Sequence, residues 1–345
     1  NGVRLPECSN CWRQEEIVGK SLRQYVNNTI NSSNTNSFDW LTYYFSKKHD
    51  YDSSLLLSAD IKLDNNCNFA CIMCNPMDSS KIWNIWNKNR DNDFVKEVLD
   101  KDSQYLDNIK LIYREKNNYR ILTQALNKKT RHIKLLGGEP LLDKNMLSIL
   151  QSCDKNISKN INLIFVTNGS IDLCEISEKL SHFRSVQYVI SLEAVGSVQD
   201  YIRRGSNWQA IEKNIINAKK NITGSIIVTH SIQALTCYHL PELLNWCSSH
   251  EIEINFGMVY RPEYLSIQSI PEPLKQQIFA KLKNSDLYFD TESDQGLEFK
   301  GHIADHIRKC EHNSDLTNKL NQFLKWYDPQ QKWKDIFPEW QPYLN

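Results

Sequence analysis

Three closely spaced cysteines near residue 70 are the strongest chemical feature of the sequence. Cys67, Cys71 and Cys74 form a Cys-x3-Cys-x2-Cys pattern directly after an apolar run. A tight loop can turn three such thiols towards one centre, and thiolates are the usual ligands of iron–sulfur clusters, four per cluster. Three ligands would leave one iron with an open coordination site, as in catalytic metal centres. The spacing therefore predicts a cluster that can bind a substrate or cosubstrate directly.

A zinc site and three incidental cysteines are the alternatives for this segment. Zinc prefers four protein ligands in a structural site. The next residues, Asn75-Pro76-Met77, supply neither Cys nor His. A non-catalytic iron–sulfur or zinc protein nevertheless stays open as a different functional class.

The composition excludes several other classes. Lys+Arg and Asp+Glu both number 41 in the 345 residues, so the formal net charge is zero and gives no electrostatic case for nucleic acid or anionic membranes. No apolar run approaches the roughly 18 residues of a membrane span.

The chain opens Asn1-Gly2-Val3-Arg4, with neither an initiator Met nor a signal segment. We therefore expect a cytoplasmic protein with reduced thiols, and a sequence that begins inside a longer chain.

Short apolar runs alternate with amphipathic stretches from Leu55 onwards, which indicates parallel strand–helix units with right-handed crossovers. This predicts an α/β fold, a partial (βα)6 TIM-like barrel over residues 51–265. Residues 1–50 form an N-terminal fragment and residues 266–345 a C-terminal helical extension, with a helix over Leu316–Tyr327. The predicted strands are Leu55–Leu63, Ile133–Leu136, Asn162–Thr167, Val186–Leu192, Gly224–Ile232 and Glu253–Val259.

The cysteine segment, with Phe69 inside it, resembles the signature of the radical S-adenosylmethionine (radical SAM) family. The resemblance implies a [4Fe-4S] cluster whose fourth iron binds the amino and carboxylate groups of S-adenosylmethionine. One-electron reduction, from a donor such as flavodoxin or ferredoxin, then cleaves the sulfonium to methionine and a 5′-deoxyadenosyl radical. That radical abstracts hydrogen from a substrate.

Later segments are similar to further motifs of this family. Gly137-Gly138-Glu139-Pro140 resembles its GGEP motif, and glycines there allow close backbone approach to a ligand. The resemblance implies that Gly137, Gly138 and Glu139 orient the methionine end of the cosubstrate. Thr167-Asn168-Gly169 resembles the turn beside the adenosine, with Asn168 facing the ribose.

Ser191-Leu192-Glu193 resembles the Ser-Leu-Asp sequence of the peptide-modifying members, with Glu193 in place of the more usual Asp. The resemblance implies that Ser191 and Glu193 lie near the ribose. Arg203 follows Ser191 by twelve positions, the spacing of the family's arginine that binds the methionine carboxylate. A guanidinium suits a carboxylate because it offers two parallel charge-assisted hydrogen bonds. A strand hydroxyl and a surface salt bridge are the alternatives.

The N-terminal Cys8-x2-Cys11, followed by Trp12, resembles part of the twitch or SPASM accessory module, which binds an auxiliary iron–sulfur cluster in related enzymes. A vestigial or zinc-binding pair is the alternative. Relatives with this module often modify peptides, so a peptide is the first substrate expected, and a sugar, nucleoside or other small metabolite the second. Cys237 follows the fifth predicted strand and is a candidate hydrogen-atom donor.

Overall fold

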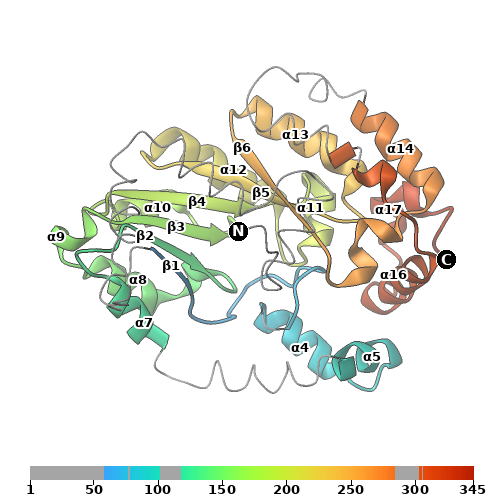
Figure 1. Cartoon of the computed structure of the whole chain (residues 1–345), viewed down its shortest axis with the longest axis horizontal. Coiled ribbons are helices and arrows are strands. Elements are labelled where there is room, and N and C mark those ends of the chain that lie inside the picture. The colour runs from blue at the N-terminus through green and yellow to red at the C-terminus, as the bar shows by residue number, and fades with distance from the viewer. Residues whose placement is uncertain (1–57, 77, 102–117, 284–302, 305) are drawn as a thin grey trace, which may run out of the picture.

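The computed structural model describes residues 58–76, 78–101, 118–283, 303–304 and 306–345, and within them six parallel strands form one open sheet in the order β1-β2-β3-β4-β5-β6 (Figure 1). Each strand pairs in parallel with the next along the chain. The predicted partial α/β barrel is therefore confirmed. The strands are β1 Ser58–Lys62, β2 His132–Leu136, β3 Asn162–Thr167, β4 Ser185–Ser191, β5 Ile226–Ile232 and β6 Glu253–Met258.

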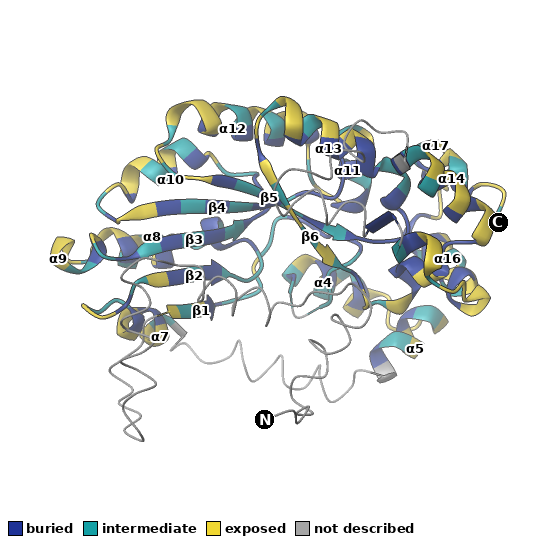
Figure 2. Ribbon diagram, turned by 45° about the horizontal axis from the view of Figure 1, so that its top comes forward, coloured by how far each residue is buried: buried dark blue, intermediate teal, exposed yellow. Residues whose placement is uncertain are grey.

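One face of the sheet is buried under helices. Buried and half-buried residues alternate along β3, β4 and β5, as strands covered mainly on one face should (Figure 2). The buried set packs with apolar residues of the helices in one core, to which Phe165, Tyr188 and Val228 contribute. The helices between β2 and β6 are α8 Lys144–Gln151, α9 Lys155–Ser158, α10 Leu173–Lys179, α11 Gly196–Ile202, α12 Trp208–Asn221 and α13 Leu240–Ser249.

The connection between β1 and β2 carries extra helices. Its described parts are α4 Ser80–Lys88, α5 Asp93–Lys101 and α7 Asn118–Ala125. Ser79 caps α4, because its side chain accepts a hydrogen bond from the Ile82 backbone N–H at 3.3 Å. The cap fixes the helix directly behind the cysteine segment.

The C-terminal segment packs against the carboxyl ends of the strands through a second core (Figure 1). Phe337 and Trp340 are completely buried in this core, together with Ile72 and Ile202 from segments far away in the sequence. The predicted helix over Leu316–Tyr327 is confirmed. The elements of this region are α14 Glu272–Lys283, α16 Ser314–Tyr327, α17 Trp333–Ile336 and the 3-10 turns η4 Cys237–His239, η5 Glu263–Leu265, η6 Ile267–Ser269 and η7 Pro338–Trp340.

The turn after β2 packs backbone to backbone against the segment after β1. A Cβ atom on Gly138 would lie 2.1 Å from the Asn66 carbonyl oxygen, and one on Gly137, where φ is +146°, would lie 2.6 Å from the Asp64 oxygen. The Glu139 N–H donates to the Asn66 carbonyl at 2.7 Å. The absence of side chains at the two glycines therefore lets this turn pack against the start of the cysteine loop, and the predicted approach of a ligand to them stays a prediction.

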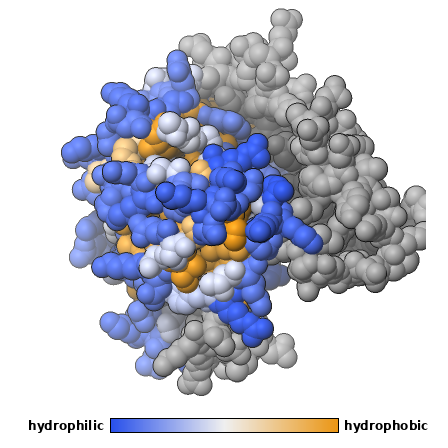
Figure 3. All heavy atoms as spheres, turned by 90° about the vertical axis from the view of Figure 1, so that its left-hand side faces the viewer, coloured by the Kyte–Doolittle hydropathy of each residue, from blue (hydrophilic) through white to orange (hydrophobic). Residues whose placement is uncertain are grey.

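Hydrophilic residues cover most of the described surface at the end of the molecule near α9, with hydrophobic residues between them (Figure 3). Among the residues described, none of the helices is long and apolar enough to cross a membrane.

The second core predicts a large cost for truncating Phe337. Replacing Phe337, which has no exposed surface, with Ala should lower the free energy of unfolding by about 3–5 kcal/mol, because it leaves a cavity. Ile121→Ala is the matched control, since this side chain is 56% exposed, and it should change stability by no more than about 0.5 kcal/mol. Urea unfolding of both variants measures the difference, and equal costs would contradict the packing described.

The glycine contact predicts a second difference. Gly138→Ala should lower the free energy of unfolding by about 1–3 kcal/mol, because backbone atoms block the added methyl group. Gly257→Ala is the control, since a Cβ there meets no atom within 4 Å, and it should cost less than about 0.5 kcal/mol. Thermal and urea unfolding would be compared for the two variants. Full stability of Gly138→Ala would show that the two turns are not in contact.

Candidate functional site

The three predicted cysteines lie on one loop at the carboxyl edge of the sheet, directly after β1. All three are free thiols; Cys71 is buried, and Cys67 and Cys74 are half-buried. Two backbone hydrogen bonds tie the loop to the end of α11, from the Ala70 N–H to the Arg204 carbonyl at 2.8 Å and from the Ile72 N–H to the Ile202 carbonyl at 2.9 Å. These bonds flank Cys71 in the loop and Arg203 at the end of α11, so the two residues lie opposite each other.

Side chains from three other parts of the chain also bind the loop. Asn168, at the end of β3, donates from its side-chain amide to Asn68 Oδ1 at 2.8 Å. Ser79 donates to the Phe69 carbonyl at 2.8 Å, and the Tyr327 hydroxyl of α16 donates to the Ala70 carbonyl at 3.3 Å. The C-terminal segment thus helps to position the cysteines.

The thiols differ in acidity because their surroundings differ. Burial raises the pKa of Cys67 to about 11. A hydrogen bond from Cys74 lowers the pKa of Cys71, and the nearby positive charge of Arg203 adds to that effect. The same bond, together with burial, raises the pKa of Cys74. The surroundings of Cys71 therefore favour its thiolate, and thiolates are the form that binds metals.

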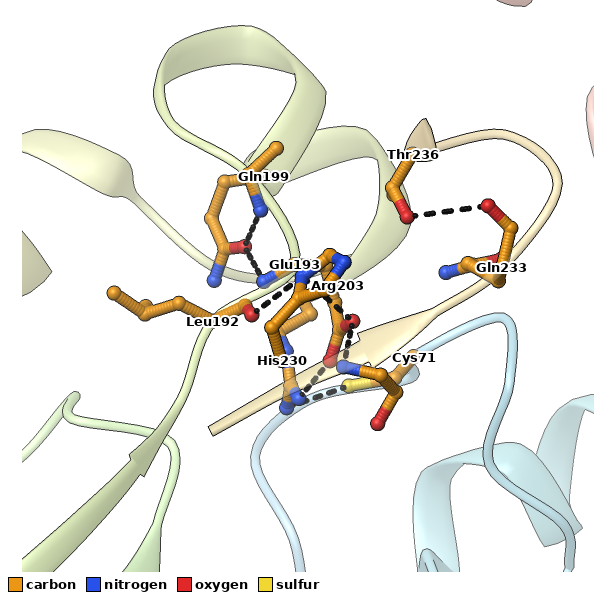
Figure 4. A network of polar contacts seen from close by, with 10 residues as sticks. Cys71, Leu192, Glu193, Gln199, Arg203, His230, Gln233 and Thr236 are labelled. Carbon is orange, nitrogen blue, oxygen red and sulfur yellow. Dashed lines mark hydrogen bonds and ion pairs between the residues drawn. The ribbon is translucent and has the colours of Figure 1, made fainter. Parts of the chain in front are cut away.

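Arg203 connects the cysteine loop with the end of β4 (Figure 4). Its Nη1 donates to the Cys71 sulfur at 3.7 Å, and its Nη2 donates to Glu193 Oε1 at 2.6 Å. Burial alone would lower the pKa of Arg203, but the charges of Cys71 and Glu193 raise it. The Nε atom of Arg203 is buried and has no hydrogen-bond partner among the described residues, so one donor remains for a ligand.

Glu193 is completely buried and is held by the ends of two strands. Its Oε2 accepts a hydrogen bond from the Ser231 N–H of β5 at 3.1 Å, and its own backbone N–H donates to the side chain of Gln199 at 2.8 Å. His230 Nδ1 lies 3.7 Å from Oε2 and 3.2 Å from the Leu192 carbonyl (Figure 4). Burial lowers the pKa of His230, which favours a neutral ring that donates to that carbonyl.

Glu139 joins the ends of β2 and β3. Its carboxylate accepts hydrogen bonds from Thr167 Oγ1 at 2.8 Å, from the Asn168 N–H at 2.7 Å and from the Leu141 N–H at 3.1 Å. Burial raises the pKa of Glu139, and these three donors oppose the shift. The carboxylate is thus already bonded within the chain, and it positions Asn168 against the cysteine loop.

The structure brings most of the predicted site residues together and separates others. Ser191 is the last residue of β4, half-buried and next to Thr229 of β5. Cys237 is completely buried in the second core, and burial raises its pKa, so its thiol would have to be uncovered before it could meet a substrate radical. Cys8 and Cys11 lie outside the described residues.

Sequence reasoning missed His230 and Gln199, which complete the surroundings of Glu193. His230 falls within a predicted strand, where the period-2 alternation places it on the same buried face as Val228 and Ile232, and a polar residue at such a position could have marked it. No comparable sequence pattern distinguishes Gln199, because its hydrogen bond from the Glu193 N–H depends on the turn between β4 and α11.

The chemistry of the site fits a cluster bound at one open edge. Among the described residues, no group of three or more His, Cys, Asp or Glu side chains could hold a single metal ion. A cluster binds each thiolate at a different iron atom, so its ligands need not meet at one point. The three free thiols suit such a cluster. The positive charge and the available Nε–H of Arg203, next to Cys71, suit an anionic ligand of the cluster.

Comparisons with known proteins give a family for this site. The family model described as "Radical SAM superfamily" matches residues 61–233, about half of the chain. That range begins in β1 and ends directly after β5, so it contains the cysteine loop and the Glu193–Arg203 pair. No curated protein matches the chain.

Three of the solved structures that resemble this chain contain a bound ligand or peptide. Native anSMEcpe with bound AdoMet is 15% identical, with 68% of this chain and 60% of that chain covered and a TM-score of 0.44. SuiB of Streptococcus suis bound to the precursor peptide SuiA is 17% identical, with 65% and 44% covered and a TM-score of 0.41. TYW1 with a lysine-pyruvate adduct is 16% identical, with 69% and 78% covered and a TM-score of 0.38.

The chain thus spans less than two thirds of the anSMEcpe and SuiB chains. The family match covers the sheet edge where the three cysteines lie, and it fixes the family: this chain belongs to the radical SAM superfamily.

Proposed function

We propose that this chain is an enzyme that cleaves S-adenosylmethionine at a [4Fe-4S] cluster held by Cys67, Cys71 and Cys74. The observation that carries the proposal is the loop of three free thiols at the carboxyl edge of a parallel sheet, with a buried arginine opposite the middle thiol. When bound, the cluster would supply the electron that breaks the sulfonium bond. The superfamily uses this cluster and cosubstrate, which supports the assignment.

Arg203 and the neighbouring strand ends would bind the cosubstrate. The unpaired Nε–H of Arg203 offers a charge-assisted hydrogen bond to the methionine carboxylate. Gly137, Gly138 and Glu139 would shape the methionine end of the site, Glu139 mainly by fixing its neighbours. Ser191, Glu193 and Asn168 would lie near the ribose. Because Glu193 accepts bonds from Arg203 and Ser231, its contribution there would be to hold other groups in place.

The substrate we propose is a peptide, with a flavodoxin or ferredoxin as electron donor. The resemblance of Cys8-x2-Cys11 to the accessory module of peptide-modifying enzymes supports this choice. We further propose that these two cysteines, in an N-terminal fragment of residues 1–50, contribute to an auxiliary cluster. Residues 51–265 would be the catalytic unit, and residues 266–345 an extension that braces it, as the bond from Tyr327 to Ala70 suggests.

Anaerobic reconstitution with iron and sulfide tests the central assignment. Cys71→Ala should lose the cluster and reduce 5′-deoxyadenosine formation to background, because it removes one of the three proposed cluster ligands. Cys153→Ala is the matched control, a half-buried thiol outside the loop, and should retain both. Iron and sulfide analysis measures the first effect, and chromatography after incubation with dithionite and S-adenosylmethionine measures the second.

Two outcomes would contradict the proposal. Equal iron and sulfide contents in wild type and Cys71→Ala would place the cluster elsewhere. An intact cluster with bound S-adenosylmethionine that yields no 5′-deoxyadenosine with any reductant would favour a binding protein over an enzyme.

A further inference from the structure

We propose that the Glu193–Arg203 pair sets the reduction potential of the cluster at Cys71, with Arg203 raising it and Glu193 limiting that rise. The inference rests on the proposed function, because it requires that the three cysteines hold a cluster. It gives Arg203 a task additional to binding the cosubstrate, and it makes Glu193 a positioning residue for Arg203.

The backbone dictates the position of the arginine. Hydrogen bonds on both sides of Cys71 pair Ala70 with Arg204 and Ile72 with Ile202, at 2.8 and 2.9 Å. Arg203 therefore lies opposite Cys71 and turns its Nη1 towards the sulfur, 3.7 Å away. Hydrogen bonds to cluster sulfurs are among the protein features that set cluster potentials.

Two opposite charges lie next to the sulfur in a buried environment. The side chain of Arg203 is 11% exposed and that of Glu193 is not exposed at all. Solvent screens buried charges weakly, so each should act strongly on a charge change nearby. Reduction adds one electron to the cluster, which a positive charge stabilises and a negative charge opposes. The two residues should therefore shift the potential in opposite directions.

The described groups that contact Glu193, other than Arg203, are neutral. Gln199 and Ser231 reach Glu193 through its backbone N–H and its carboxylate, respectively, and neither carries a charge. His230 also faces Glu193, and its buried ring donates to a carbonyl, as a neutral imidazole can. Among the described residues, Arg203 and Glu193 are thus the charged side chains that act on the Cys71 sulfur, besides the other loop thiols. Glu139 acts on Cys67 instead.

The test is an EPR-monitored redox titration of the reconstituted chain without S-adenosylmethionine, using dithionite as reductant. At a fixed potential, Arg203→Gln should lower the ratio of reduced to oxidised cluster about tenfold, a shift of about 59 mV to more negative values for a one-electron couple. Glu193→Gln should raise that ratio by a similar factor. Arg203→Lys keeps the charge and should shift the potential less than Arg203→Gln.

Arg204→Gln is the matched control, since the exposed Arg204 packs over the Tyr327 ring and has the same charge. It should leave the potential unchanged. The double variant Arg203→Gln/Glu193→Gln should fall between the two single variants. If burial makes Arg203→Gln unstable, Arg203→Lys and Glu193→Gln still give the signs, because both retain hydrogen-bonding groups.

The outcomes separate this inference from the proposed function. A wild-type chain that assembles no cluster overturns both. A wild-type cluster that cleaves S-adenosylmethionine, combined with shifts of the same sign in the Arg203 and Glu193 variants or with no shift in either, overturns only the inference. Opposite shifts at unchanged iron content support it.

Discussion

A buried positive charge next to a thiol is the interaction on which the carboxyl edge of this fold depends. The Arg203 guanidinium has little access to water, and an unpaired charge in that position would cost several kcal/mol. Glu193 compensates for it at 2.6 Å, and the Cys71 sulfur accepts a second hydrogen bond. Because the pair spans the cysteine loop, α11 and β4, satisfying one charge fixes the relative positions of all three.

Two buried carboxylates organise this edge in the same way. Glu139 joins the ends of β2 and β3, and Glu193 joins the ends of β4 and β5. Each gains hydrogen bonds that offset the loss of hydration. The cysteine loop lies against both through Asn168 and Arg203, and Tyr327 from the C-terminal segment holds it from a third direction. The site is therefore assembled from side chains that are far apart in the sequence.

The strands, the cysteine loop and the position of Arg203 could be predicted from the sequence, because apolar runs and short spacings are local features. The partners of these residues could not. The sequence predicts cosubstrate contacts for Glu139 and Arg203, which stay predictions, but it does not predict that Glu139 accepts hydrogen bonds from three donors of its own chain or that Arg203 pairs with Glu193. Such pairings depend on where strands end in three dimensions. The same holds for Cys237, whose burial follows from packing by the C-terminal segment. Cys8 and Cys11 lie outside the described residues, so their role stays a prediction.

A crystal structure of the anaerobically reconstituted chain with S-adenosylmethionine would test the account most directly. We expect Cys67, Cys71 and Cys74 each bound to a different iron of one cluster, the fourth iron bound to the cosubstrate, and Arg203 between the Cys71 sulfur and Glu193. A single tetrahedral ion enclosed by protein ligands, or an Arg203 side chain turned away from Cys71 and Glu193, would contradict it.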